Sequence, residues 1–176
     1  GSGLFGHSAI YLGTPAELQA LGMFNDAELA KHEEALMRDM LIVESAQRHN
    51  TGLSTLAYVG DTDRIAVLRP KGISKAARKQ AIRSGFERIG RKFDHHFRLD
   101  TPDKLYCTEL IDQMLPQLKL PRHEVYGREI IYPDDLVKMA ARGSRLDFVA
   151  AVAADRENWR KVSVGDLIAD IAMAGD

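Results

Sequence analysis

The chain has 176 residues, of which 45% are hydrophobic and 28% charged, and its formal net charge at pH 7 is -1. This length fits a single domain with a real hydrophobic core, and a nearly neutral chain has no global field to attract nucleic acid or an anionic membrane. The single cysteine forbids an internal disulfide and leaves the redox compartment open, and the lack of a long apolar run predicts no integral membrane segment.

Helices and strands are expected in mixed order. In the first half of the chain, the patterns predict a strand at residues 7–13, helices at 14–22 and 25–40, strands at 40–46 and 64–70, and a helix at 74–92. In the second half, they predict a strand at 93–100, a helix at 132–143, a strand at 146–153 and a helical tail from Arg156. Between the strand at 93–100 and the helix at 132–143 lies a helix that contains Cys107, starts near 103–105 and stops near 121. This order differs from the regular βαβ alternation of a doubly wound sheet. It predicts one α+β domain over residues 4–176, without internal repeats or linkers. Residues 1–3 resemble a tag remnant, so the predicted domain begins at residue 4.

Several well-known chemical motifs do not occur in the sequence. It contains no phosphate-binding loop, no paired zinc cysteines and no dinucleotide fingerprint. The stretch HEEAL at His32 starts like a zinc helix but has Leu36 where the second histidine is needed. His95 and His96 are adjacent, and on a strand they point to opposite faces, so one is expected inward and one in solvent. We therefore expect no metal and no organic cofactor.

Cys107 stands at the front of an amphipathic helix. A thiol there is either a small hydrophobe packed in a core or a nucleophile at a helix N-terminus, where the helix dipole favours the thiolate. Glu109, two residues on, works weakly against that effect. The apolar residues that share its stripe are Leu110, Ile111, Met114, Leu115 and Leu118.

A nucleophilic thiol needs a base, and His7 is the distinctive candidate because it opens an apolar strand. Glu44 is equally unusual, since it ends an apolar strand where an unpartnered carboxylate is costly. If these two strands pair antiparallel, His7 and Glu44 become neighbours, and a carboxylate can then orient an imidazole that activates a thiol. Without that pairing, His7 is a turn histidine and Glu44 is an acid at the edge of a sheet that reaches solvent. The histidines considered as bases are His7, His32, His49, His95, His96 and His123.

Three stretches in this order, FGHSAIYLG, LIVESA leading to RIAVLRP, and RKFDHHFRLDTPDKLYCTELI, resemble the circularly permuted papain-like amidases of the YaeF/YiiX type. These belong to the NlpC superfamily of cell-wall hydrolases, and IYPDDLV also resembles their segment after the cysteine helix. The resemblance covers roughly residues 4–150 and leaves residues 155–176 as a C-terminal extension. The stretch of residues 14–39 is longer and more charged than expected for the family, which suggests a lid or a partner surface.

The resemblance implies a permuted papain-like fold, an antiparallel β-sheet or barrel packed against helices. It implies a bacterial cysteine hydrolase in which Cys107 is the nucleophile, His7 the general base and Glu44 the residue that orients His7. The backbone N–H of Cys107 would form part of an oxyanion hole. Tyr106 and Thr108, which flank the nucleophile, would line the substrate site.

The substrate class stays open at this point. The kinship suggests peptides of the cell wall or, as in the related lecithin retinol acyltransferase group, acyl chains of lipids. A binding module that keeps the fold without turnover is the alternative, and it would leave Cys107 buried and inert. The basic helix from Lys75 to Arg91 suits a solvated face or a grip on acidic partners, and we retain the solvated face because acidic residues balance its charge. The sequence leaves open the oligomeric state and the compartment, either bacterial cytoplasm or envelope.

Overall fold

The computed structural model describes residues 3–155 and 157–175. Up to the fourth strand, its elements are β1 (Ile10–Tyr11), α1 (Pro15–Ala20), the 3-10 helix η1 (Met23–Asn25), α2 (Ala27–Ala30), α3 (Glu33–Met37), β2 (Ile42–Ala46), β3 (Asn50–Ser54), α4 (Leu56–Val59) and β4 (Arg64–Pro70). The remaining elements are α5 (Lys75–Phe86), β5 (Lys92–Phe93), β6 (Lys104–Leu105), α6 (Cys107–Met114), η2 (Pro116–Leu118), β7 (His123–Val125), β8 (Arg128–Ile130), α7 (Pro133–Ala141), β9 (Leu146–Asp155), β10 (Asn158–Lys161) and α8 (Val164–Ala174).

The strands form several small sheets. β1, β2 and β3 make one antiparallel sheet, β10, β9 and β4 make another, and β7 pairs antiparallel with β8. The short β5–β6 pair is parallel. The α+β class is confirmed. Within the described residues no sheet closes into a barrel, so that alternative does not occur, and the expectation of antiparallel pairing fails for β5 and β6.

Local capping signals produced the predicted helix starts. The Thr14 hydroxyl accepts a hydrogen bond from the backbone N–H of Glu17 at 3.2 Å, and the Ser74 hydroxyl accepts one from Ala77 at 3.1 Å. Pro133 occupies the first position of α7, where its missing N–H costs nothing. These three predicted starts are confirmed. They could be predicted from the sequence because each depends only on residues within one turn.

Several predicted helices are shorter than expected. The helix α5 ends at Phe86 instead of residue 92, and α6 ends at Met114 instead of near residue 121. The helix expected over residues 25–40 is divided into α2 and α3, and at the break the ring of His32 packs against that of Phe86, with centroids 5.5 Å apart. In the tail, residue 156 lies outside the described residues. Residues 158–161 form β10 against β9, and the helix α8 begins only after its cap, Ser163.

The predicted strand at residues 93–100 is wrong beyond Phe93. The buried carboxylate of Asp94 accepts hydrogen bonds from the backbone N–H groups of His96 and Arg98, both at 2.9 Å, and these bonds curl the chain into a loop. His95 and His96 are both exposed, so the expectation that one of them points inward is also wrong. In the described part of the chain, no group of three or more ligating side chains could hold a metal ion.

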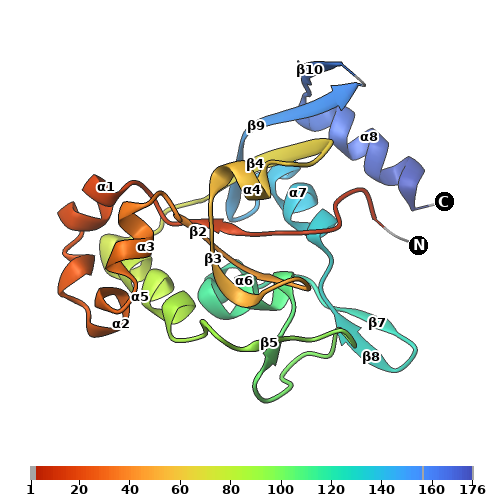
Figure 1. Ribbon diagram of the computed structural model, residues 1–176. Coiled ribbons are helices and arrows are strands. Elements are labelled where there is room, and N and C mark those ends of the chain that lie inside the picture. Colours follow the sequence, from red (N-terminus) through yellow and green to blue (C-terminus); the bar gives the residue numbers. More distant parts are fainter. Residues whose placement is uncertain (1–2, 156, 176) are drawn as a thin grey trace.

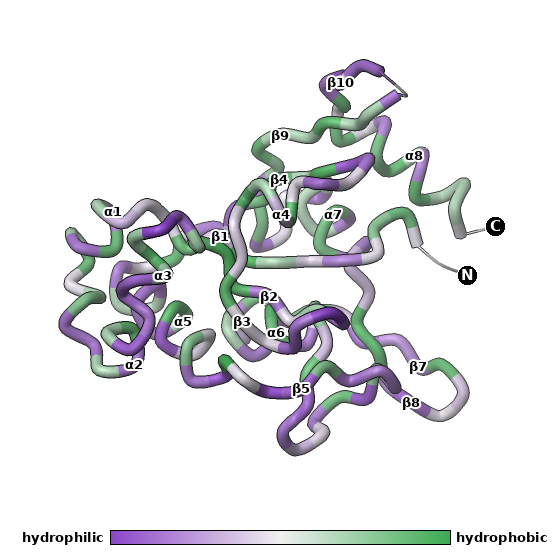
Figure 2. The backbone as a smooth tube through the Cα atoms, viewed as in Figure 1, coloured by the Kyte–Doolittle hydropathy of each residue, from purple (hydrophilic) through white to green (hydrophobic). Residues whose placement is uncertain are grey.

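The hydrophobic core has two parts. The larger cluster lies among α1 to α3, β2, α5 and α6, and the smaller cluster lies among α7, β9 and α8. Figure 2 shows green, hydrophobic segments meeting around β1 and β2, whereas the tube around β5 is mostly purple. The stretch of residues 14–39, suggested above as a lid or partner surface, packs onto the larger cluster through the buried side chains of Leu18, Met23, Leu29 and Leu36.

Figure 1 shows the first segment of the chain, in red, crossing the molecule from the side of α7 and α8 to the helices α1 to α3. Among the described helices, none combines the length and the apolar composition needed to cross a membrane.

Candidate active site

Cys107 is the first residue of α6. Tyr106 precedes it as the N-cap in an extended conformation, so the helix begins at Cys107 instead of between residues 103 and 105. The predicted apolar stripe is confirmed, because Leu110, Ile111 and Met114 are buried in the larger cluster. Cys107 itself is only 5% exposed. Its backbone N–H belongs to the first turn, where the helix supplies no acceptor, and the positive end of the helix dipole lies there.

His7 and Glu44 are neighbours across the first sheet. β1 and β2 pair antiparallel, with Ile10 opposite Val43 and Tyr11 opposite Ile42, as the prediction required. This pairing carries the segment before β1 over Glu44 in β2. The His7 Nε2 atom lies 2.5 Å from the Glu44 Oε2 atom, a close charge-assisted hydrogen bond.

Glu44 is 1% exposed, and its carboxylate accepts further hydrogen bonds. His49 Nε2 lies 2.9 Å from Oε1, and the Ser54 hydroxyl donates to the same oxygen. Burial alone would raise the pKa of Glu44, but the hydrogen bonds from His7 and Ser54 and the charges of both imidazoles outweigh it and lower the pKa. The sequence named His49 only as one possible base, and no local signal predicted that it shares Glu44.

The imidazole of His7 and the thiol of Cys107 lie near enough for each to shift the pKa of the other. Since Nε2 faces Glu44, the nitrogen available to the thiol is Nδ1. Burial alone would lower the pKa of His7, but the bonds to Cys107 and Glu44 raise it to about 9. Burial likewise would raise the pKa of Cys107, but the hydrogen bonding and charge of His7 lower it. The pair therefore favours thiolate and imidazolium.

Tyr106 and Thr108 do not lie where a substrate could touch them. They are 1% and 0% exposed, and both are bonded to Ile131 before α7. The Ile131 N–H donates to the Tyr106 hydroxyl at 3.1 Å, and the Thr108 hydroxyl donates to the Ile131 carbonyl at 2.7 Å. The expectation that these side chains line the substrate site is therefore corrected: they fasten the start of α6 to the segment before α7.

Glu109 is the unusual acid of this helix. It is 1% exposed; its Oε1 accepts the Asp100 N–H at 2.8 Å, while Oε2 is buried without a hydrogen-bond partner among the described residues. Burial, with the nearby charges of Asp100 and Asp94, raises its pKa to about 7. This carboxyl is thus half protonated near neutral pH.

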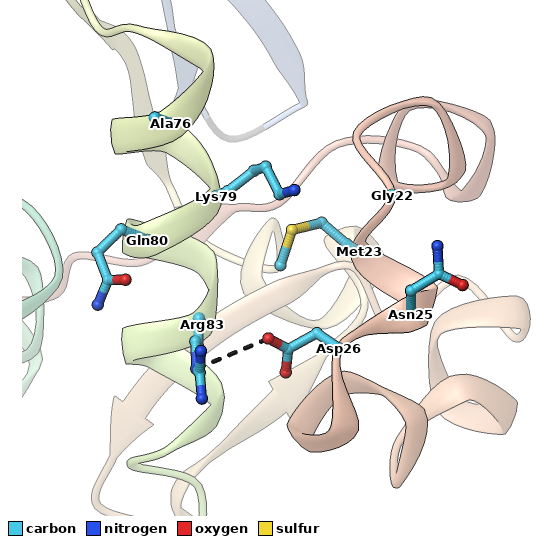
Figure 3. Close-up of a pocket in the computed structure, with 8 residues that line it drawn as sticks. All are labelled: Gly22, Met23, Asn25, Asp26, Ala76, Lys79, Gln80 and Arg83. Carbon is cyan, nitrogen blue, oxygen red and sulfur yellow. Dashed lines mark ion pairs between the residues drawn. The ribbon is translucent and has the colours of Figure 1, made fainter.

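A separate cavity of about 420 Å³ lies between η1 and α5, away from these residues (Figure 3). Arg83 of α5 and Asp26 face each other across it, with Nε and Oδ2 3.6 Å apart, and Arg83 also pairs with Glu87. These partly exposed ion pairs are typical of a solvated face. The residues that line the cavity are Gly22, Met23, Asn25, Asp26, Ala76, Lys79, Gln80 and Arg83.

The family of the chain follows from one comparison. The profile of a family described as permuted papain-like amidase enzyme, YaeF/YiiX, C92 family, matches residues 2–163. The match includes residues 155–163, which the motifs had left outside the resemblance, so that only α8 and the residues after it follow the matched part. Comparisons with curated proteins and with solved structures gave no match. Because the profile covers most of the sequence and all the segments that meet around the thiol, the chain belongs to this family of permuted papain-like amidases.

Proposed function

We propose that this protein is a cysteine hydrolase that cleaves an amide or ester bond through a thioester on Cys107. The observation that carries the proposal is the chain of contacts from Glu44 through His7 to the thiol, with 2.5 Å between the carboxylate and the imidazole. A buried carboxylate that orients an imidazole, which in turn ionises a nucleophile, is the arrangement that acyl transfer requires.

In the first half of the reaction the Cys107 thiolate attacks the substrate carbonyl carbon. The C–S bond forms as the carbonyl electrons move to oxygen, and the backbone N–H of Cys107 at the start of α6 stabilises this oxyanion. The oxyanion then collapses and the bond to the leaving nitrogen or oxygen breaks. His7 gives its Nδ1 proton to the leaving group, and the thioester and a neutral imidazole remain.

In the second half, water attacks the thioester carbonyl while His7 takes a proton from it. The C–S bond breaks, the acid is released, and thiolate and imidazolium are restored. Glu44 keeps its charge throughout and holds His7 in the tautomer that presents Nδ1 to sulfur. The proposal requires neither a metal nor an organic cofactor.

Peptides of the bacterial cell wall are the substrate class that we propose first. Membership in an amidase family favours an amide over an ester bond, and the resemblance to cell-wall hydrolases favours peptides. Intact mass measurement after incubation with cell-wall fragments should detect a peptidyl adduct on Cys107 if release is slow. A fatty-acyl adduct after incubation with phospholipids instead would move the proposal to lipid acyl substrates.

The proposed ion pair is tested by alkylating Cys107 with iodoacetamide across a pH series. We expect the thiol to titrate well below about 8.5, the value for a free cysteine. His7→Asn removes the positive charge beside the thiol and leaves the thiol buried. The alkylation rate of Cys107 at pH 6.5 should therefore fall at least about tenfold.

His123→Asn is the matched control for this experiment. His123 also binds a buried carboxylate, with Nε2 2.8 Å from Asp135 Oδ2, but it is not a contact of Cys107. Its replacement should leave the titration curve unchanged. The proposed function would be contradicted if the wild-type thiol titrated near 8.5 and His7→Asn left its titration curve unchanged.

A further inference from the structure

The segment that carries His7 is only weakly held by its own strand. β1 begins at Ile10, three residues after His7, and only two of its residues pair with β2. A ladder this short leaves the chain before it free to move relative to the sheet. The close approach of His7 to both Glu44 and Cys107 therefore needs a second anchor on the other side of His7.

That anchor is the carboxylate of Asp134 in the first turn of α7. Its Oδ1 accepts the N–H of Phe5 at 2.8 Å, and its Oδ2 accepts the N–H of Leu4 at 2.9 Å. Asp134 is only 6% exposed, so both bonds are charge-assisted and shielded from water. The approach is so close that a Cβ atom added at Gly3 would collide with Oδ2 of Asp134.

Apolar contacts support the same anchor. Leu4 and Phe5 pack against the smaller cluster that α7, β9 and α8 enclose. In Figure 1 the red segment enters the molecule beside α7 and α8. Only Gly6 separates Phe5 from His7, so the anchor lies within one short stretch of the imidazole.

The nucleophile is tied to the same part of the chain. Ile131, three residues before Asp134, binds both Tyr106 and Thr108, the two neighbours of Cys107. Pro133 fixes the backbone between these two attachment points. Residues 131–134 therefore bind the base-bearing segment at one end and the nucleophile-bearing helix at the other.

We propose that Asp134 is a positioning residue that holds His7 against Cys107 through the backbone of Leu4 and Phe5. This inference rests on the proposed function, because it concerns the same imidazole and thiol. It assigns to the first turn of α7 the task of setting the distance between base and nucleophile.

The test is the alkylation titration of Cys107 in Asp134→Asn. The amide keeps one acceptor oxygen but turns an NH₂ group toward a backbone N–H, so one of the two bonds is lost. A loosened His7 stabilises the thiolate less. We expect the alkylation rate at pH 6.5 to fall about three- to tenfold, while the rate on the alkaline plateau stays unchanged.

Asp135→Asn is the matched control. Asp135 is the adjacent acid in the same helical turn, equally buried, but it binds His123 and the backbone of Tyr132 instead of the N-terminal segment. Its replacement should lower the melting temperature without shifting the titration. If Asp135→Asn shifts the curve as much as Asp134→Asn does, the effect comes from a weakened α7 and the inference is wrong.

Two further variants keep the test decisive if Asp134→Asn folds poorly. Gly3→Ala places a methyl group against the Asp134 carboxylate and should shift the titration in the same direction. In the double variant His7→Asn with Asp134→Asn, the second change should add nothing, because Asp134 acts through His7. An additional shift in the double variant would overturn the inference.

The outcomes separate the two proposals. If His7→Asn shifts the titration and Asp134→Asn and Gly3→Ala do not, the positioning role is wrong and the cysteine hydrolase stands. If His7→Asn itself has no effect, the proposed function fails, whatever Asp134 does.

Discussion

The two sides of the site are held in different ways. Cys107 and Glu44 lie on α6 and β2, whose neighbouring side chains, such as Leu110 and Val43, are buried in the larger cluster. His7 lies on an irregular segment whose apolar residues, Leu4 and Phe5, are only partly buried against the smaller cluster. The thiol and the carboxylate are thus fixed by close packing, whereas the imidazole is held by a few polar bonds and by the partly buried Leu4 and Phe5.

This difference shows how a site can be built across a boundary. The partly buried side chains of Leu68 and Phe148 pack against both clusters, so the two clusters are in contact. Few side chains are shared in this way. Close packing resists displacement in every direction. A pair of hydrogen bonds holds only the groups that form them, so the geometry between His7 and Cys107 depends on individual side chains.

The largest effect is expected where the two sides meet, at Glu44. Glu44→Gln has one acceptor oxygen for the donors of His7, His49 and Ser54, so at least one donor faces the new NH₂ group. We expect the hydrolysis rate to fall about a thousandfold, with the protein still folded. Glu34→Gln, on an exposed pair with Arg38, is the control. Activity within a factor of a few of wild type would contradict the role of Glu44.

The difference between the two hydrophobic clusters is tested by Leu167→Ala in α8. Leu167 is completely buried in the smaller cluster, and we expect its truncation to lower the free energy of unfolding by about 2–4 kcal/mol. Leu110→Ala is the counterpart in the larger cluster. Hydrogen exchange should show faster opening of α8 and β9 than of α6 in Leu167→Ala. Equal acceleration in both regions would mean that the two clusters unfold as one unit.

A smaller effect, with a defined pH dependence, is expected at Glu109. Its pKa of about 7 exceeds the ordinary 4.5, so the folded protein binds this proton more tightly than the unfolded chain does. Its contribution to stability is therefore complete below about pH 4.5 and is lost as the pH rises through 7.

Glu109→Gln imitates the protonated acid and should remove this loss. Relative to wild type, the variant should gain about 1–2 kcal/mol in free energy of unfolding between pH 5 and pH 8, measured by urea denaturation. Glu124→Gln, at an exposed position in β7, should show no such gain. A constant difference between wild type and Glu109→Gln at all pH values would contradict the assigned titration.

The sequence predicted those features that depend on near neighbours. Helix starts at Thr14, Ser74 and Pro133 and the buried stripe after Cys107 all follow from residues within one or two turns. The placement of His7 beside Glu44 was predicted because it needed only one antiparallel pairing. The strand expected at residues 93–100 failed because the Asp94 side chain offers the backbone a competing set of hydrogen bonds.

Other features were decided only by tertiary structure. His49 was one histidine among six, and nothing near it in sequence shows that it shares the carboxylate of Glu44. Asp134 resembles any acid in the first turn of a helix, yet it binds the backbone of Leu4, 130 positions away. Local chemistry determines a cap or an amphipathic face because the interacting groups are bound to be near each other. Contacts between distant segments exist only once the two clusters have packed, and these contacts decide how His7 meets Cys107.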